Sequence, residues 1–343
     1  MAPLNPGVLE SLTTSSALSA AVQAYEVARL PRKDSPNTLA ARARDVAGIT
    51  PRLAAVVDAT EPLVGDLTTP ALRAAFADFS LDHARSSIAR CWSTWNGLCG
   101  FLVAEDVLPG NPMSGVHRPR PVEQGPKPLR GNDTPEVLLD AVAAGRRARD
   151  PWPERDLAVV ATLLVTGIRS AELVGLRIGD LAGTAGERRV RVRGKGGAER
   201  SLPVEEALAE LVDRYLASRA RRFPAARAPR LDAPLFVDTR GRALSRHQLQ
   251  YLVEQCYRAA GVSDRVQRGA LVHALRHTFA TRVVASGASA VEVMRLLGHR
   301  SLATSQQYVD AGADELRSAA AASRSYAALR TLACDAGSHA AVT

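Results

Sequence analysis

The chain has 343 residues and a formal net charge of +9, from 44 Lys and Arg against 35 Asp and Glu. This length suits about two domains, and 46% hydrophobic content excludes global disorder. The longest apolar stretch, 157–168, is too short for a membrane span, the first residues lack a secretory-signal pattern, and four scattered cysteines predict neither disulfides nor zinc. We therefore expect a cytoplasmic, metal-free protein with an anionic partner, nucleic acid first.

Helical spacing of apolar residues predicts helices throughout the first part of the chain. We expect them within about 7–29, after Ser35-Pro36, after Thr69-Pro70 and at about 82–103. The second of these has an expected apolar face made of Leu39, Ala43, Val46 and Ile49. In the longest one we expect the tryptophans at 92 and 95 to pack in a core. These patterns predict a helical domain at 35–116, preceded by an N-terminal extension at 1–34.

A proline-rich segment separates two parts of different charge. Six prolines and three glycines between 108 and 130 predict an extended linker, which we place at 117–130. Residues 1–125 carry 11 Lys and Arg against 12 Asp and Glu, whereas residues 126–343 carry 33 against 23. The whole positive excess therefore belongs to the second part of the chain.

The second part is predicted to combine helices with one β-hairpin. Val190 and Val192 alternate before the turn Gly-Lys-Gly-Gly at 194–197, and Leu202 and Val204 alternate after it, which is typical of a hairpin. Helices are expected at 157–166 and at about 205–219, 245–260, 273–285, 289–297 and 313–332. The fold class is therefore mostly α with a small β-hairpin, with a second domain at 131–312 and a C-terminal tail at 313–343.

Basic residues, histidines and one tyrosine in the second part indicate a phosphate site. His273 and Arg276 are three residues apart and so share a helix face. The other candidates are Arg169 after a glycine turn, Lys195 in the hairpin turn, His299 after a helix-ending glycine, and Tyr308. No carboxylate cluster predicts a metal site, and the hairpin glycines lack the spacing of a P-loop. Taken singly, each candidate is more often structural; their joint occurrence favours the phosphate site.

At these residues the chain resembles the tyrosine recombinases, the Xer and phage-integrase family. The resemblance covers about 35–310 and is strongest at TGIRSAELVGLR, GKGG, HALRHTFAT and LLGHRSLATSQQY. The family order Arg, Lys, His-x-x-Arg, His, Tyr is reproduced without departure at Arg169, Lys195, His273, Arg276, His299 and Tyr308. The resemblance implies a helical, SAM-like core-binding domain at 35–116 and an α+β catalytic domain at 131–312.

The resemblance also implies an activity, in which DNA strands are cut and rejoined through a covalent 3′-phosphotyrosine without metal, cofactor or ATP. Tyr308 would attack phosphorus, and the arginines at 169 and 276 would bind the non-bridging oxygens. Lys195 would protonate the leaving oxygen as general acid. His273 is expected to assist proton transfer at the tyrosine, and His299 to bond a phosphate oxygen.

Two further residues are assigned supporting roles. Glu172 follows Arg169 by three residues and is expected to orient an arginine side chain. His277 directly follows Arg276 and is expected on a different helix face, so we interpret it as a packing or backbone-bonding residue. The arginines at 240, 242 and 246 are candidates for contact with the DNA backbone, with a solvated surface as an equal alternative.

The implied partners are double-stranded DNA carrying specific core sites and further copies of the chain. A dimer per site and a tetramer in the synapse are expected, and accessory proteins are compatible with the resemblance. The extension at 1–34 is too short for a separate arm-binding domain, so we expect action on core-type sites alone. The tail at 313–343 is expected to dock on a neighbouring protomer, with packing on its own domain as the alternative.

Three other functions stay open at this point. An enzyme with the same residues could relax DNA as a type IB topoisomerase does, or resolve hairpin telomeres. A non-enzymatic architectural protein could use the basic second part only to coat phosphates. The target sequence and the biological use, whether integration, excision, inversion or dimer resolution, are not determined by these residues.

Overall fold

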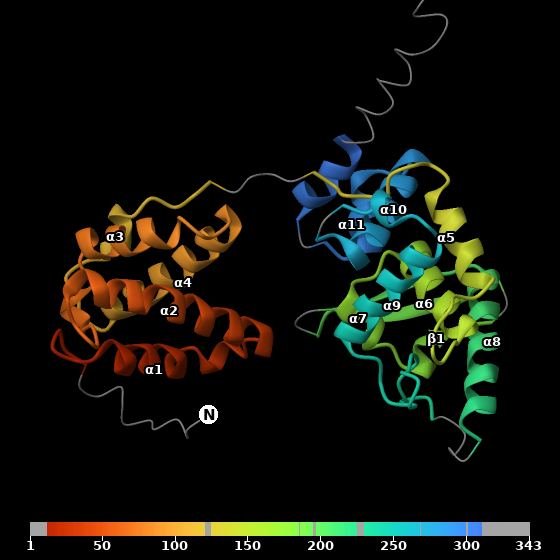
Figure 1. Cartoon of the computed structure of the whole chain (residues 1–343), viewed down its shortest axis with the longest axis horizontal. Coiled ribbons are helices and arrows are strands. Elements are labelled where there is room, and N and C mark those ends of the chain that lie inside the picture. Colours follow the sequence, from red (N-terminus) through yellow and green to blue (C-terminus); the bar gives the residue numbers. More distant parts are fainter. Residues whose placement is uncertain are drawn as a thin grey trace, which may run out of the picture. The chain divides into compact units, whose positions relative to one another are not determined.

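The computed structural model describes residues 12–120, 125–184, 186–194, 197–224, 230–267, 269–299 and 301–310. The chain divides into two compact units, Met1–Gln124 and Gly125–Thr343, which are coloured along the sequence in Figure 1. Lys195 and the expected tail at 313–343 lie outside the described residues. In the part of the chain that is described, no helix is long and apolar enough to cross a membrane.

The first unit is built from helices. These are α1 (Leu18–Ala28), α2 (Pro36–Val57), α3 (Thr69–Phe79) and α4 (Arg85–Ala104), joined by 3-10 turns at Leu30–Arg32, Val64–Asp66 and Pro112–Gly115. The helix expected at about 82–103 is confirmed as α4. Trp95 is fully buried, as expected, whereas Trp92 is half-buried and its indole N–H donates to the carbonyl of Val116 at 2.8 Å.

The buried face of α2 matches the expected one only at Ile49. Leu39 is exposed, and the positions that α2 buries are Arg42, Asp45, Ile49 and Leu53. Asp45 explains the difference, because its carboxylate accepts hydrogen bonds from Arg90 Nη2 at 2.8 Å and Thr94 Oγ1 at 2.9 Å, both on α4. A carboxylate with such partners can be buried, so a polar residue takes part in the helix contact that apolar spacing assigns elsewhere.

The second unit places a small sheet beside a helical core. Its helices are α5 (Thr134–Ala143), α6 (Pro153–Thr166), α7 (Ser170–Val174), α8 (Glu206–Arg222), α9 (Arg246–Ala259), α10 (Leu271–Ala285) and α11 (Ala290–Leu297), with 3-10 turns at Ile178–Asp180 and Ser263–Arg265 and a helical segment at 302–310. Its strands are β1 (Leu181–Ala182), β2 (Arg189–Arg193) and β3 (Glu199–Pro203). Helix α6 packs against α5, α8 and α10. This arrangement confirms the mostly helical fold class.

The expected hairpin is confirmed and carries a third strand. The sheet is antiparallel in the order β1-β2-β3, with Val190 opposite Leu202 and Val192 opposite Arg200. Val190, Val192 and Leu202 are buried in the core of the second unit. Because strand residues alternate between faces, Arg200 shares the inward face of β3 with Leu202. The short strand β1 has no signal in the sequence pattern.

The chain entering the second unit is bound to it. The backbone N–H of Leu129 donates to Thr278 Oγ1 at 2.9 Å, and the N–H of Arg130 donates to the carbonyl of Arg265 at 3.0 Å. These two residues belong to the segment expected as a linker. The first bond anchors it to α10, which carries two of the candidate histidines, and the second to the 3-10 turn at Ser263–Arg265.

We expect Asp45→Ala to lower the free energy of unfolding of the first unit by about 1–3 kcal/mol, because the hydroxyl of Thr94 loses its buried acceptor. Urea unfolding followed by tryptophan fluorescence measures this, since two of the three tryptophans lie on α4. The matched control is Asp78→Ala, which removes an exposed ion pair with Arg52 and should change the value by less than about 0.5 kcal/mol. Equal losses in the two variants would contradict the role of Asp45.

Candidate active site

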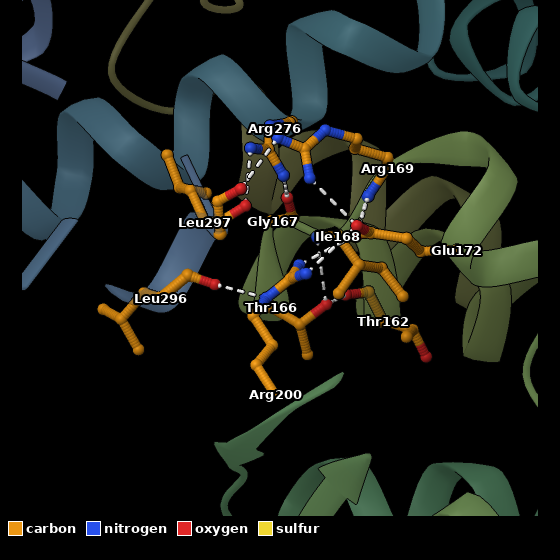
Figure 2. A network of polar contacts seen from close by, with 11 residues as sticks. Thr162, Thr166, Gly167, Ile168, Arg169, Glu172, Arg200, Arg276, Leu296 and Leu297 are labelled. Atoms are coloured by element: carbon orange, nitrogen blue, oxygen red, sulfur yellow. Dashed lines mark hydrogen bonds and ion pairs between the residues drawn. The ribbon is translucent and has the colours of Figure 1, made fainter. Parts of the chain in front are cut away.

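Three arginine side chains meet at the C-terminal end of α11 (Figure 2). Each donates to a different one of three successive carbonyls: Arg200 Nε to Leu296 at 3.0 Å, Arg276 Nη2 to Leu297 at 2.9 Å, and Arg169 Nη2 to Gly298 at 3.1 Å. The last carbonyls of a helix have no partner within the helix and carry partial negative charge. The helix end therefore holds together side chains from β3, α10 and the start of α7.

Glu172 joins two of these arginines. Its carboxylate is buried and accepts from Arg169 Nη1 at 2.9 Å and from Arg200 Nη1 and Nη2 at 3.0 and 2.8 Å. It also accepts from the backbone N–H of Arg169 at 2.8 Å, as a capping residue of α7 does. Burial acts to raise the pKa of Glu172, but the bonds from Arg200 and Arg169 outweigh it and hold that pKa below its usual value. Glu172 therefore binds the side chains of both Arg169 and Arg200.

Arg276 is buried, and its hydrogen bonds within the described residues go to backbone carbonyls. Its Nη1 donates to the carbonyl of Gly167 at 2.5 Å, and its Nη2 to that of Leu297. Burial and the nearby charge of Arg169 lower the pKa of Arg276 to about 10, so the group is still a cation at neutral pH. A buried cation held by neutral carbonyls keeps its attraction for an anion.

Two glycines shape the backbone that these arginines bind. Gly167 ends α6 and Gly298 ends α11, both with a positive φ of about 60° that favours glycine. A Cβ at Gly167 would collide with the ring of Phe279, and one at Gly298 would lie 2.8 Å from Arg200 Nη1. Glycine is therefore required at 167 by the packing of Phe279 and at 298 by the close approach of Arg200.

Tyr308 lies in the helical segment 302–310 with its ring buried, at 4% exposure. Its hydroxyl is 2.8 Å from Nδ1 of His277, in hydrogen-bond contact, and its ring stacks on that of His299 with centroids 6.1 Å apart. Burial raises the pKa of Tyr308, and the positive charges of Arg276 and Arg169 oppose that effect. The phenol is thus protonated at neutral pH and lies within the field of the two arginines.

Three residues of α10, at positions 273, 276 and 277, lie on one side of that helix. His277 is half-buried and its ring packs near that of Tyr308, with centroids 5.6 Å apart; beyond this packing, its Nδ1 also contacts the hydroxyl of Tyr308. Adjacent helix residues differ by only about 100° in direction, so both can fall within one broad face. The spacing of four between His273 and His277 was the signal for this, and their ring centroids are 6.3 Å apart.

The histidines of the site are neutral at neutral pH. Burial, with the charges of neighbouring groups, lowers the pKa of both His277 and His299 to about 4. His299 Nδ1 lies 2.8 Å from the hydroxyl of the buried Ser305. His273 is exposed, yet the surrounding protein and the cations Arg276, Arg169 and Arg246 lower its pKa as well. Within the described residues, the Tyr308 hydroxyl is bonded to His277 and not to His273.

Most of the residues named from the sequence are brought together here. Of the six in the family order, Arg169, Arg276, His299 and Tyr308 are linked by the contacts above, and His273 lies on the same helix as Arg276. Lys195 is outside the described residues, so the structure gives it no position. Sequence reasoning missed Arg200 and Ser305. The signal for Arg200 was its inward position in the strand alternation, two residues before Leu202.

The arrangement can bind and stabilise an anion. The labelled side chains of Figure 2 include three guanidinium groups and one carboxylate, which leaves an excess of positive charge. In the described part of the chain, no group of three His, Cys, Asp or Glu residues could hold a metal ion.

Three other arginines, at 240, 242 and 246, were considered as contacts to the DNA backbone. Arg242 is paired with Asp238 at 3.1 Å, and Arg246 is close enough to His273 to affect the pKa of that histidine.

Comparison with known proteins agrees with this geometry. Residues 132–315 match the Phage integrase family. Tyrosine recombinase XerC of Halalkalibacterium halodurans is 31% identical over 240 residues, which are 70% of this chain and 76% of that protein. The solved structure of XerH site-specific recombinase bound to a palindromic difH substrate has a TM-score of 0.70 at 19% identity, covering 89% of this chain and 84% of that one. A lambda integrase tetramer bound to a Holliday junction has a TM-score of 0.62 at 18% identity, covering 84% and 79%. The chain belongs to the phage integrase family and is a tyrosine site-specific recombinase.

Proposed function

We propose that this recombinase cuts a DNA strand by attack of the Tyr308 hydroxyl on a backbone phosphodiester. The phenol oxygen forms a bond to phosphorus, the bond to the 5′-oxygen breaks, and the products are a 3′-phosphotyrosine and a free 5′-hydroxyl. The 5′-hydroxyl of another strand then attacks the phosphotyrosine and rejoins the DNA. The observation that carries the proposal is the buried Tyr308 hydroxyl in the field of two arginines bound to one helix end.

Arg169 and Arg276 are proposed to bind the two non-bridging oxygens of the phosphate. A guanidinium group has five N–H donors, and each of these arginines uses only two of its nitrogens in the bonds described. The phosphate gains negative charge as it accepts the fifth oxygen, so the two cations stabilise the transition state more than the ground state. The fixed positions of both arginines mean that little reorganisation is needed when that charge develops.

His277 is proposed to hold the attacking hydroxyl. A neutral imidazole can accept from the phenol, and the low pKa of His277 keeps it neutral across the physiological range. We propose that this contact orients Tyr308. His299 is proposed to support the Tyr308 ring by stacking on it and to bond a phosphate oxygen. His273, exposed beside Arg276, remains our proposed helper in proton transfer once DNA covers the site.

Lys195 is proposed to protonate the leaving 5′-oxygen. Its position in the Gly-Lys-Gly-Gly turn and the family order of residues support this role. An alkoxide is a poor leaving group, so a cationic acid near it would speed cleavage. The strands β2 and β3 that lead to the turn are bound to the site through Arg200.

The proposed partners are a DNA duplex with a specific core-type site and other copies of the chain. The XerH structure contains its difH substrate, and the lambda integrase structure is a tetramer on a Holliday junction. We infer a dimer on each site and a tetramer when two sites recombine, acting on DNA in the cytoplasm. The comparisons do not favour a topoisomerase-like, telomere-resolving or purely architectural protein.

A nicked suicide substrate tests the proposed reaction. When the short fragment beyond the cut diffuses away, rejoining fails, so the wild-type chain should accumulate a denaturant-resistant protein–DNA adduct. Tyr308→Phe should bind the same DNA in a mobility-shift assay and give no adduct. A bound substrate that yields no adduct with the wild-type chain would instead favour an architectural protein.

Alanine at either arginine should separate cleavage from binding. We expect Arg169→Ala and Arg276→Ala each to slow single-turnover cleavage by about 1,000-fold while half-site affinity changes by less than about tenfold, because they act mainly in the transition state. Rates of adduct formation and mobility shifts on one substrate measure the two effects. Equal losses of affinity and rate would show that the arginines contribute only to binding.

Removal of the His277 ring should slow cleavage by about tenfold, the equivalent of one hydrogen bond to the nucleophile. The matched control is His277→Asn, whose amide lies near the position of Nδ1 and should retain most of the rate. Because the pKa of His277 is lowered to about 4, the ratio of the wild-type to the His277→Ala rate should stay constant from about pH 8 to pH 6. A ratio that changes around the ordinary histidine pKa would contradict the neutral, orienting role.

A further inference from the structure

We infer that Arg200 is a positioning residue for strand cleavage, which holds Glu172 and the end of α11 so that Arg169 is free to bind the phosphate. Arg200 is not among the six residues of the family order, and it lies on β3 rather than on α10, which carries two of them. The inference rests on the proposed function, since it concerns how the proposed phosphate ligands are aligned.

The guanidinium nitrogens of Arg200 bind groups of the protein itself. All three of its nitrogens make bonds: Nε to the carbonyl of Leu296, and Nη1 and Nη2 to the two oxygens of Glu172. Its side chain is only 15% exposed. The bonds of Arg169 described above use Nη1 and Nη2 and leave Nε, and those of Arg276 go only to backbone carbonyls. Because their partners differ in this way, Arg200 positions the site, and Arg169 and Arg276 are the residues that bind the phosphate.

Glu172 explains why this hold affects the chemistry. Its carboxylate is shared, because Oε1 accepts from both Arg169 and Arg200. With Arg200 present, much of the negative charge of Glu172 is neutralised by a bidentate partner. Without Arg200, the carboxylate would attract Arg169 alone and compete with the phosphate for its guanidinium group. Arg200 thus keeps Glu172 as an anchor for Arg169 without letting it neutralise that cation.

Arg200 also supports the turn that precedes His299. Its guanidinium lies against the backbone of Gly298, where an added Cβ would be 2.8 Å from Nη1. The next residue is His299, whose ring stacks on Tyr308. One side chain therefore contacts the anchor of Arg169 and the backbone beside the residue that packs on the nucleophile. In Figure 2, Arg200 reaches from its strand toward both Leu296 and Glu172.

The test compares Arg200→Gln with Arg193→Gln on the suicide substrate. Arg193 is on β2 of the same hairpin and makes a similar bidentate pair with a buried carboxylate, Asp180, at 2.7 Å. Loss of Arg200 should slow adduct formation by about 100-fold, the cost of misplacing a reacting group, with half-site affinity within about threefold. Arg193→Gln should keep its rate within about fivefold. Equal slowing in both would mean that the hairpin's stability, not alignment, is responsible, and would overturn the inference.

A double-variant cycle with Glu172→Gln tests the route of the effect. If Arg200 acts through Glu172, the double variant should be no slower than the slower single variant, whereas multiplied losses would contradict the coupling. Arg200→Lys, which keeps the charge but not the fork, should fold if the glutamine variant does not, and should still lose more than tenfold in rate. A wild-type rate in a folded Arg200→Lys would overturn the inference.

The leaving group separates this role from that of Lys195. A substrate with sulfur in place of the bridging 5′-oxygen leaves without a proton, so it should restore cleavage by Lys195→Ala. Arg200→Gln should remain slow on it, because its defect lies at the phosphate oxygens. Rescue of Arg200→Gln by this substrate would contradict the inference. A wild-type chain that forms no adduct would overturn the proposed function instead, so the two failures are distinguishable.

Discussion

Three successive carbonyls at the end of α11 accept hydrogen bonds from three arginines, and the geometry of the site depends on this contact. The arginines come from a strand, a helix and a helix N-terminus that are far apart in the sequence. A helix end offers fixed acceptors with partial negative charge, so it can orient cations without neutralising them as carboxylates would. The glycine that ends α11 lets the arginines approach, and the histidine that follows packs on the tyrosine.

The charges of the site are divided according to what each arginine binds. Arg276 contacts carbonyls, Arg169 shares a carboxylate with its neighbour, and Arg200 is fully paired with that carboxylate. The positive charge is therefore least neutralised at Arg276 and most neutralised at Arg200. A phosphodiester that gains charge on attack is best stabilised by cations that are already in place. Arg169 and Arg276 are the two cations left to stabilise it.

The sequence was sufficient for the fold class and the hairpin, and it named most of the side chains that the structure brings together, because alternation, helix caps and an ordered motif are local signals. The sequence did not predict contacts between residues that are far apart along the chain. Arg200 binds a carbonyl 96 residues away, and no local pattern shows such a contact. The contact of His277 with Tyr308 was missed because adjacency to Arg276 was taken to mean a different face, whereas the two lie on one broad face of α10. Asp45 was overlooked for a similar reason, since its partners lie on another helix.

We propose that two arginines fixed at the end of α11 bind one phosphate in line with Tyr308. The most direct measurement is a structure of the protein on a cleaved site with vanadate, which adopts the five-coordinate geometry of the attacked phosphate. We predict the Tyr308 oxygen at one apical position, Arg169 and Arg276 on equatorial oxygens, and Arg200 still on Glu172. Vanadate bound with either of the first two arginines away from it, or with Arg200 turned onto it, would contradict the account.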